Sequence, residues 1–304
     1  MITKNAMITI AGRPNVGKST LINTLTGEKI AIVTNKPQTT RNRIFGVVNA
    51  EDSQLVLMDT PGFHKAQSRL GDYMIGIVRQ SIANVDAVML LVEPIPHVGT
   101  QEQLLIERIK ETRVPAVLVI NKIDSVTKES LLEVISVYSS AHEFDAIIPI
   151  SARNGDGIAQ LLAELVEYAK DGPQLFPEGM TTDQPERQVI AELVREKLLT
   201  NLQREVPHGT AVEVTKFSER GEESEQDDDP EPIIDVDVII YCEKASHKGM
   251  IIGKNGAMLK KIGQQARVDI ERFMGAKVFL QTWVKVKENW RDNNSAVRNF
   301  GYKD

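Results

Sequence analysis

One short stretch near the start of the chain has the residue types that bind a phosphate group. It consists of Gly12, Arg13, Pro14, Asn15, Val16, Gly17, Lys18 and Ser19. This matches the pattern G-x-x-x-x-G-K-[ST], with an apolar strand pattern before it and a helical pattern after it. Glycines let successive backbone N–H groups surround an anion, and the following helix points its positive N-terminus at the same anion. Lys18 is expected to reach the β- and γ-phosphates and the Ser19 hydroxyl to bind Mg²⁺, so the stretch predicts a nucleotide site.

Two further motifs would complete a magnesium site. The first is the D-x-x-G sequence, which consists of Asp59, Thr60, Pro61 and Gly62 and follows a second apolar strand pattern. We expect Asp59 to hold Mg²⁺ through water and the Gly62 N–H to contact the γ-phosphate. In the polar loop before it, Thr40 is preferred over Thr39 as the group that binds Mg²⁺ only when a γ-phosphate is present, which would make it a switch. The alternative for either threonine is a solvated loop residue.

Base selectivity is expected from four residues at the end of another strand pattern. They are Asn121, Lys122, Ile123 and Asp124. A carboxylate at Asp124 accepts hydrogen bonds from guanine N1–H and the 2-amino group, whereas adenine would leave that carboxylate without partners. We expect the Lys122 stem to lie along the base and Asn121 to brace the loop. Ser151 and Ala152 are expected to offer a backbone N–H to guanine O6, so the motifs together predict a guanine-nucleotide-binding domain.

The residue after the D-x-x-G motif bears on hydrolysis. Ras-like enzymes have a glutamine there that orients the attacking water, whereas this chain has Phe63, which cannot hydrogen-bond water. Turnover should therefore be slow unless another group stabilises the developing charge. Asn15 is a candidate through a bound K⁺, and simple support of the loop is the alternative. The residues expected to act on the reacting phosphate are Lys18, Thr40, Gly62 and Asn15.

Alternating strand and helix patterns must position these loops. The apolar strand patterns are Met7–Ala11, Gln54–Asp59, Ala87–Val92, Ala116–Asn121 and Ile147–Ser151. The helical patterns lie near Gly71–Ala83, Gln101–Lys110, Leu131–Tyr138 and Ile158–Lys170. This order predicts an α/β domain with a mostly parallel sheet, helices on both faces, and functional loops at the carboxyl ends of the strands. Ile44–Ala50 should form an antiparallel edge hairpin with Gln54–Asp59.

The chain of 304 residues is long enough for two domains. We expect a nucleotide domain over residues 1–171, a linker with two prolines over 172–184, and a second domain over 185–304. The second domain should begin with a helix over Pro185–Leu202, with Asp183 as its N-cap. Strands are expected over Ala211–Phe217 and Ile233–Cys242.

Charge is unevenly distributed in the second domain. Glu219–Glu231 is strongly acidic and is expected to be a solvated loop between two strands. Between Lys244 and Arg291, by contrast, eleven lysines and arginines stand against three acids, an excess of eight positive charges in a chain whose net charge is -6. Such a concentration indicates a polyanionic partner.

A G-x-x-G sequence lies inside this basic region and precedes a helical pattern that starts at Ala257. By itself it is weak evidence, but the order helix–strand–strand–helix–G-x-x-G–helix–strand resembles a type II KH domain, an α+β fold that clamps about four nucleotides of RNA. The residues expected to contact RNA are Lys248, Ile252, Gly253, Lys254, Asn255, Gly256, Lys260 and Lys261. Trp283 and Trp290 are further candidates for base stacking, although Trp283, in an alternating strand pattern over Val278–Val286, is expected to be a core residue.

Three segments, Gly12–Thr20, Gln38–Arg41 and Asp59–Gly62, resemble the Era family of GTPases, and the likeness continues through the KH-like region to cover nearly the whole chain. The resemblance implies a P-loop GTPase that binds GTP, GDP and Mg²⁺. It also implies a role in assembly of the small (30S) ribosomal subunit, through the 3′ region of 16S ribosomal RNA. Relatives of this kind also associate peripherally with the inner membrane, but no amphipathic anchor pattern is visible here. We expect a cytoplasmic monomer.

The sequence disfavours two other classes of function. A signalling GTPase could use the basic domain to dock a protein, but the G-x-x-G sequence disfavours this. A nucleotide-dependent modification enzyme would need a second catalytic constellation, and none is visible. The single cysteine, Cys242, excludes an intramolecular disulfide and a multi-cysteine zinc site and is expected to be a small buried residue of a strand. The sequence shows neither an apolar run of about 20 residues nor a signal-peptide pattern.

Overall fold

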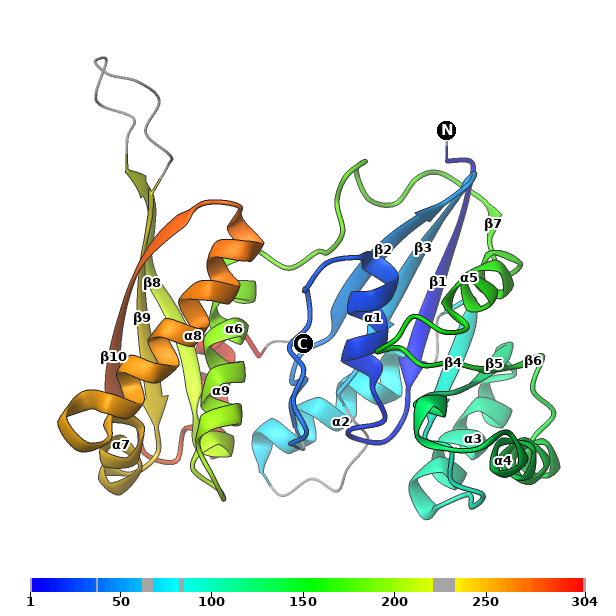
Figure 1. Ribbon diagram of the computed structural model, residues 1–304, viewed down its shortest axis with the longest axis horizontal. Coiled ribbons are helices and arrows are strands. Elements are labelled where there is room, and N and C mark those ends of the chain that lie inside the picture. Colours follow the sequence, from blue (N-terminus) through cyan, green and yellow to red (C-terminus); the bar gives the residue numbers. More distant parts are fainter. Residues whose placement is uncertain (1, 37, 62–67, 82–84, 221–232, 303–304) are drawn as a thin grey trace. The chain divides into compact units, whose positions relative to one another are not determined.

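The computed structural model describes residues 2–36, 38–61, 68–81, 85–220 and 233–302 (Figure 1). These residues form two compact units, and the boundary along the chain falls between Asp183 and Gln184.

The first unit is built on a mostly parallel sheet with the strand order β2-β3-β1-β4-β5-β6. The strands are β1 (Lys4–Ala11), β2 (Ile44–Ala50), β3 (Ser53–Asp59), β4 (Ala87–Val92), β5 (Ala116–Ile120) and β6 (Ala146–Pro149). β1 lies parallel to both β3 and β4, and β2 pairs antiparallel with β3, so the predicted edge hairpin is confirmed. The parallel arrangement brings the carboxyl ends of β1, β3, β4 and β5 to one edge of the sheet.

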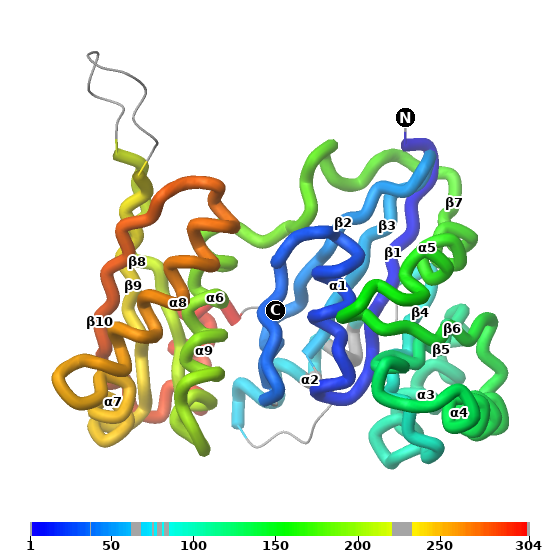
Figure 2. Tube along the Cα trace, viewed as in Figure 1, coloured from blue at the N-terminus to red at the C-terminus, as the bar shows by residue number. Residues whose placement is uncertain are grey.

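Helices cover both faces of this sheet (Figures 1 and 2). They are α1 (Lys18–Thr26), α2 (Arg69–Ser81), α3 (Thr100–Thr112), α4 (Lys128–Ala141) and α5 (Ile158–Val166). The side chains of β4 alternate between two cores: Met89 and Leu91 pack with α1 and α5, whereas Val88 and Leu90 pack with α3 and α4. Every residue of β4 is therefore buried, which explains why its sequence is apolar throughout.

The end of the last helix in this unit was predicted wrongly. α5 ends at Val166, and Lys170–Asp171 form a short strand, β7, that pairs antiparallel with Lys4 and Asn5 of β1. Backbone hydrogen bonds and the Asn5 amide, which donates to the Pro173 carbonyl at 2.8 Å, hold this pairing. Because β7 is polar, it carries no hydrophobic pattern that a sequence reading could detect.

The predicted linker is hydrogen-bonded to the first unit along much of its length. Gln54 is fully buried in β3, and its Oε1 accepts hydrogen bonds from the backbone N–H groups of Leu175 and Phe176, both at 2.8 Å. The Val47 N–H donates to the Thr181 carbonyl at 2.8 Å, next to a bridge between Gly46 and Thr182. The segment thus supplies partners to edge strand β2, whose N–H groups would otherwise face solvent.

Asp183 is not the helix cap that the sequence predicted. Its Oδ1 accepts a hydrogen bond from the Phe45 N–H at 3.1 Å, and Pro185 occupies the N-cap position of α6 (Glu186–Asn201). The carboxylate is used by the neighbouring strand, a contact that local sequence patterns cannot show.

The second unit is a three-stranded sheet with helices packed on one face. Its elements after α6 are β8 (Ala211–Arg220), β9 (Ile233–Cys242), α7 (Ala245–Ile252), α8 (Ala257–Met274), β10 (Lys277–Val286) and α9 (Asn294–Asn299). β9 is central, antiparallel to β8 and parallel to β10. α6 contacts α8 and β8, and α8 also contacts β10. Cys242 is buried at the end of β9, as expected.

The two tryptophans have the reverse of their expected environments. Trp290 is fully buried, with its indole N–H donating to the Gly209 carbonyl at 2.9 Å, so it cannot stack on a base. Trp283 is 44% exposed, because it occupies an outward-facing position of edge strand β10. Of the predicted acidic loop, Glu219 instead belongs to β8, and residues 221–231 lie outside the described residues.

Across the described part of the chain, the model contains no helix with the length and apolar character of a membrane span.

Candidate nucleotide site and G-x-x-G loop

The phosphate-binding stretch joins the carboxyl end of β1 to the first turn of α1. α1 begins at Lys18 directly after Gly17, whose φ is 105°. A Cβ atom at Gly17 would collide with the Asn121 amide nitrogen, and one at Gly12 would come within 2.5 Å of the Leu91 carbonyl oxygen. Both glycines are therefore required by close packing as well as by the turn itself.

Lys18 is a buried cation whose present partners are backbone carbonyls. Its Nζ donates to the Gly12 oxygen at 3.1 Å and to the Arg13 oxygen at 2.9 Å. Burial lowers the pKa of Lys18 to about 8, and the nearby Asp59 carboxylate opposes part of that shift. A phosphate bound in the loop would supply the negative charge that such a buried ammonium group needs.

The three predicted magnesium ligands converge although they come from three segments. The Ser19 Oγ lies 2.9 Å from both the Thr40 Oγ1 and the Asp59 Oδ2, and the last two atoms are 3.3 Å apart. Thr39 faces elsewhere, since its hydroxyl donates to the Lys36 carbonyl at 2.6 Å. The geometry therefore brings Thr40, rather than Thr39, to the other two ligands.

Asp59 itself indicates that a cation fits here. Burial raises the pKa of Asp59, while Lys18 and the two hydroxyls act in the opposite direction. Its Oδ1 is buried and accepts no hydrogen bond from the described residues. Oxygen ligands of this kind, one carboxylate and two hydroxyls, are what Mg²⁺ prefers.

The base-recognition residues are tied to the phosphate loop by side-chain hydrogen bonds. The Asn121 amide donates to the Val16 carbonyl at 2.8 Å and accepts from the Ala152 N–H at 3.0 Å. The Ser151 hydroxyl donates to Asp124 Oδ1 at 2.7 Å and so orients that carboxylate. The Ser151 N–H donates to the Asp156 carbonyl at 3.0 Å, so both backbone N–H groups expected to reach guanine O6 have protein partners in this structure.

Glu93 is a functional candidate that the sequence reading missed. It follows β4, and its Oε1 accepts from the Lys122 Nζ at 2.5 Å while its Oε2 lies 3.4 Å from the Arg13 Nη2. Arg13 also pairs with the buried Glu102 of α3. The sequence signal that could have identified Glu93 is its position at the carboxyl end of a parallel strand.

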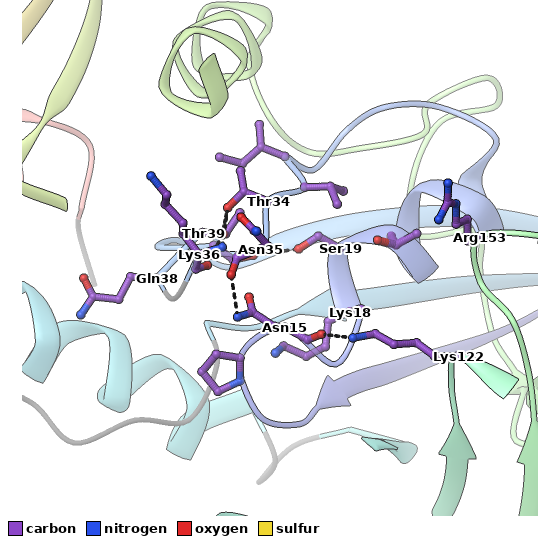
Figure 3. A pocket seen from close by; sticks show the side chains of 16 residues that line it. Asn15, Lys18, Ser19, Thr34, Asn35, Lys36, Gln38, Thr39, Lys122 and Arg153 are labelled. Carbon is purple, nitrogen blue, oxygen red and sulfur yellow. Dashed lines mark hydrogen bonds between the residues drawn. The ribbon is translucent and has the colours of Figure 1, made fainter. Parts of the chain in front are cut away.

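Lys18, Ser19 and Thr40 line one cavity of about 440 Å³, shown in Figure 3, whereas Asp59 and Asp124 are not among its lining residues. One wall is the phosphate loop, another is the segment 32–40, and Lys122 and Arg153 line the far end. Asn15, which has φ 67°, donates its side-chain amide to the Asn35 carbonyl at 2.9 Å and so links the first two walls. Gly62 and Phe63 lie outside the described residues, so their predicted roles have no structural counterpart here.

The G-x-x-G sequence forms the junction between α7 and α8. Gly253 (φ 73°) ends α7 and Gly256 (φ 77°) immediately precedes α8. A Cβ at Gly253 would meet Met258 at 2.7 Å, whereas nothing lies within 4 Å of a Cβ at Gly256. Lys254, Lys260 and Lys261 are exposed around the junction, and Lys248 and Ile252 are half-buried. The open space at Gly256, beside a helix N-terminus, allows a backbone phosphate to approach closely.

Comparison with known proteins decides the family. A model described as 50S ribosome-binding GTPase matches residues 7–122, and a KH domain model matches residues 205–291. GTPase Era of Ruminiclostridium cellulolyticum is 49% identical over 100% of this chain and 99% of its own length, and that of Alkaliphilus metalliredigens is 47% identical over 100% of both. The chain belongs to the Era family of GTPases.

Solved structures of Era proteins have the same architecture over their whole length. A crystal structure of a variant of Aquifex aeolicus Era bound to GDP.AlF4⁻ has a TM-score of 0.91, with 35% identity over 99% of this chain and 100% of that one. Era in complex with MgGDPNP and nucleotides 1506–1542 of 16S ribosomal RNA has a TM-score of 0.92 at the same identity and coverage. The predicted fold, a P-loop GTPase domain followed by a type II KH domain, is confirmed, and the protein is a GTPase.

Proposed function

We propose that this GTPase binds the 3′ region of 16S ribosomal RNA through its KH domain and acts as a GTP-dependent switch in assembly of the 30S subunit. The observation that carries the proposal is the open G-x-x-G junction at Gly256, in a segment with eight excess positive charges. An open glycine turn within so much positive charge favours RNA over the protein-docking alternative. The Era structure that contains 16S ribosomal RNA nucleotides supports the choice of RNA.

At the nucleotide site, each described residue has a distinct task. Lys18 would neutralise the β- and γ-phosphates, while Asp124, oriented by Ser151, would accept hydrogen bonds from guanine. Ser19, Thr40 and Asp59 would hold Mg²⁺, which when bound neutralises charge on the phosphate oxygens. The remaining assignments, with Thr60 and Pro61 beside the phosphates and Gly62 at the γ-phosphate, complete the site.

The switch would operate through Thr40. Its hydroxyl already lies 2.9 Å from Ser19, and the segment before it contacts the phosphate loop through the hydrogen bond from Asn15 to Asn35. Loss of the γ-phosphate would remove the Mg²⁺ coordination that favours this position of Thr40. Segment 32–40 would then be released, and the change would reach strand β2, which begins at Ile44.

Hydrolysis is proposed to depend on K⁺ held by Asn15. The Asn15 side chain lines the cavity, where its amide nitrogen donates to the Asn35 carbonyl and its Oδ1 would be the ligand for the cation. We expect faster hydrolysis in K⁺ than in Na⁺ at constant ionic strength, and loss of that difference in Asn15→Ala. Equal rates in the two salts would show that Asn15 only supports the loop.

We propose that the protein works in the cytoplasm as a monomer. Peripheral contact with the cytoplasmic face of the membrane is a separate proposal that rests on the family resemblance alone. Fractionation of cells at low and high salt tests it, since a charge-mediated association would be released by salt.

The RNA proposal is tested with Gly256→Asp. An aspartate there adds negative charge where a phosphate would approach, so affinity for a tetranucleotide RNA should fall by at least about tenfold. Basal GTP hydrolysis should stay unchanged, because the nucleotide site is in the other unit. Gly275→Asp is the matched control: Gly275 also has positive φ and open space around its Cβ position, but at the opposite end of α8. Undiminished RNA binding by Gly256→Asp would leave the protein-docking alternative ahead.

A further inference from the structure

The edge strand of the second unit presents an unusual row of side chains to solvent. Five alternate residues of β10 are exposed, and we call them the β10 strip: Lys277, Phe279, Gln281, Trp283 and Lys285. Phe279 is 47% exposed and Trp283 44% exposed, and exposed large apolar side chains that lie together are an informative feature of a protein surface. On the other face of the same strand, Val278 and Val284 are buried.

The β10 strip lies on the face of the sheet opposite to α6 and α8. Val278 and Val284 belong to the face of the sheet that packs against the helices, and on the neighbouring strand Val236 and Val238 are likewise fully buried. α8 contacts β10 on that inner face, and Figure 1 shows α6 and α8 on one side of the sheet. The G-x-x-G junction leads directly into α8 on the inner face, so the strip points to the opposite face of the sheet.

The charge around the strip favours an anionic partner. Residues 277–287 contain three lysines and no acid. The Arg220 guanidinium lies 4.9 Å from the centre of the Phe279 ring, which adds a cation at one end. Asp235, which pairs with Phe279 across the strands, forms ion pairs with Lys216 at 3.1 Å and with Arg220 at 2.6 Å, so these three groups together contribute one positive charge.

We propose that the β10 strip is a second binding surface for single-stranded RNA, on which bases stack against Trp283 and Phe279. Lys277 and Lys285, at the two ends, would pair with phosphates, whereas Asp237 beside Gln281 keeps phosphates away from the middle. The two aromatic residues are four positions apart, or about 13 Å along a strand, so each would take a different base. Aromatic side chains interleaved with cations are the usual means of binding single strands without sequence preference.

A protein partner is less well suited to this surface. Protein interfaces have a contiguous apolar centre, depleted in lysine, with charged groups at the rim. Here the apolar residues are separated by Gln281 and flanked by lysines, so no such centre forms. The inference rests on the proposed RNA-binding function, and it extends the RNA contact beyond the roughly four nucleotides that a KH domain clamps.

Intrinsic fluorescence gives a direct test, because Trp290 is buried and Trp283 is exposed. A ribosomal RNA fragment of about twelve nucleotides should quench Trp283, whereas one of about four, sufficient for the G-x-x-G junction, should not.

Trp283→Ala should weaken binding of the longer RNA by about 5- to 150-fold, the range for loss of one stacked base, while leaving the shorter RNA unaffected. Trp283→Phe should retain most of the affinity, and Phe279→Ala should weaken it in the same way. Leu132→Ala, which truncates an exposed side chain of the first unit, is the control.

The outcomes separate this proposal from the RNA function on which it rests. Loss of tetranucleotide binding in Gly256→Asp, with quenching by the longer RNA retained at saturation, supports both. Absence of RNA binding by the wild-type protein overturns both. Binding of the longer RNA with unchanged fluorescence, and equal affinity in Trp283→Ala, overturns the strip alone. Self-association that Trp283→Ala abolishes also overturns it, since the strip would then contact a second copy.

Discussion

At the scale of single residues, the nucleotide site contains charges that the protein alone does not satisfy. Lys18 and Asp59 are both buried. Burial lowers the pKa of Lys18 and raises that of Asp59, and in each case it favours the neutral form. Each opposes the shift of the other, but the Asp59 Oδ1 still lacks a hydrogen-bond donor among the described residues. Burial of charged groups without partners costs free energy, and bound phosphate with Mg²⁺ would supply the missing partners.

Binding of GTP should therefore depend on pH through Lys18. In the nucleotide-free protein the pKa of Lys18 is lowered to about 8, and phosphate would raise it by favouring the charged form. Binding then requires a proton only above that pKa, so affinity should be level below about pH 8 and fall by up to about tenfold per pH unit above it. Titration calorimetry between about pH 7 and 9 measures this. A Lys18→Arg variant, weaker but permanently charged, should show no such fall, and a flat profile for the wild type would contradict the assignment.

The choice of base should rest on Asp124. In Asp124→Asn an amide replaces one carboxylate oxygen with a donor, which conflicts with the guanine 2-amino group and suits a base that has an oxygen there. We expect GTP affinity to fall by about 10³-fold or more and xanthosine triphosphate to become the preferred ligand. Competition between the two nucleotides measures the reversal. A variant that prefers GTP by the original margin would remove Asp124 from base recognition.

At the scale of elements, the sequence predicted apolar segments well and polar contacts poorly. β2, β4 and β9 have the predicted bounds because each is a run of buried or alternating apolar side chains between turn residues. β7 and the pairing of residues 172–183 were missed, since backbone hydrogen bonds and the Gln54 amide hold them. The motifs named Ser19, Thr40 and Asp59, but only the fold could show that Glu93 joins Arg13 to Lys122.

Gln54 should control how firmly the segment after β7 is held. Its fully buried amide exchanges hydrogen bonds with Leu175, Phe176 and Asn49. Gln54→Ala would leave several buried groups without partners, so the free energy of unfolding should fall by about 2–4 kcal/mol. Urea unfolding measures this loss, and limited proteolysis should show faster cleavage within residues 172–183. Gln174→Ala removes a single exposed hydrogen bond to Phe176 and should change neither; equal cleavage in the two variants would contradict the role of Gln54.

At the scale of the whole molecule, charge of opposite sign is concentrated in two neighbouring parts of one unit's sequence. Residues 221–231 contain seven acids and no base, whereas residues 244–291 carry an excess of eight positive charges. The acidic stretch follows β8, whose last residue, Arg220, contacts Phe279 of the β10 strip. An RNA that approaches the basic region therefore also meets the field of the acids, at distances where salt decides how much of that field is felt.

Replacing these seven acids with their amides should strengthen RNA binding, and only at low salt. The net charge of the chain would change from -6 to +1, because seven negative charges are removed. If the acids act through space, affinity should rise by about 3- to 10-fold at about 50 mM salt, where the screening length exceeds 10 Å, and by less than about twofold near 0.5 M. The wild-type affinity should itself fall with salt at a log–log slope of about −0.7 for each phosphate contacted. Binding curves for both proteins across this range, with GTP affinity as the control, make the comparison. A gain that persists at 0.5 M would mean that the acidic stretch competes with RNA by direct contact, because screening cannot remove the effect of a group that occupies the binding surface.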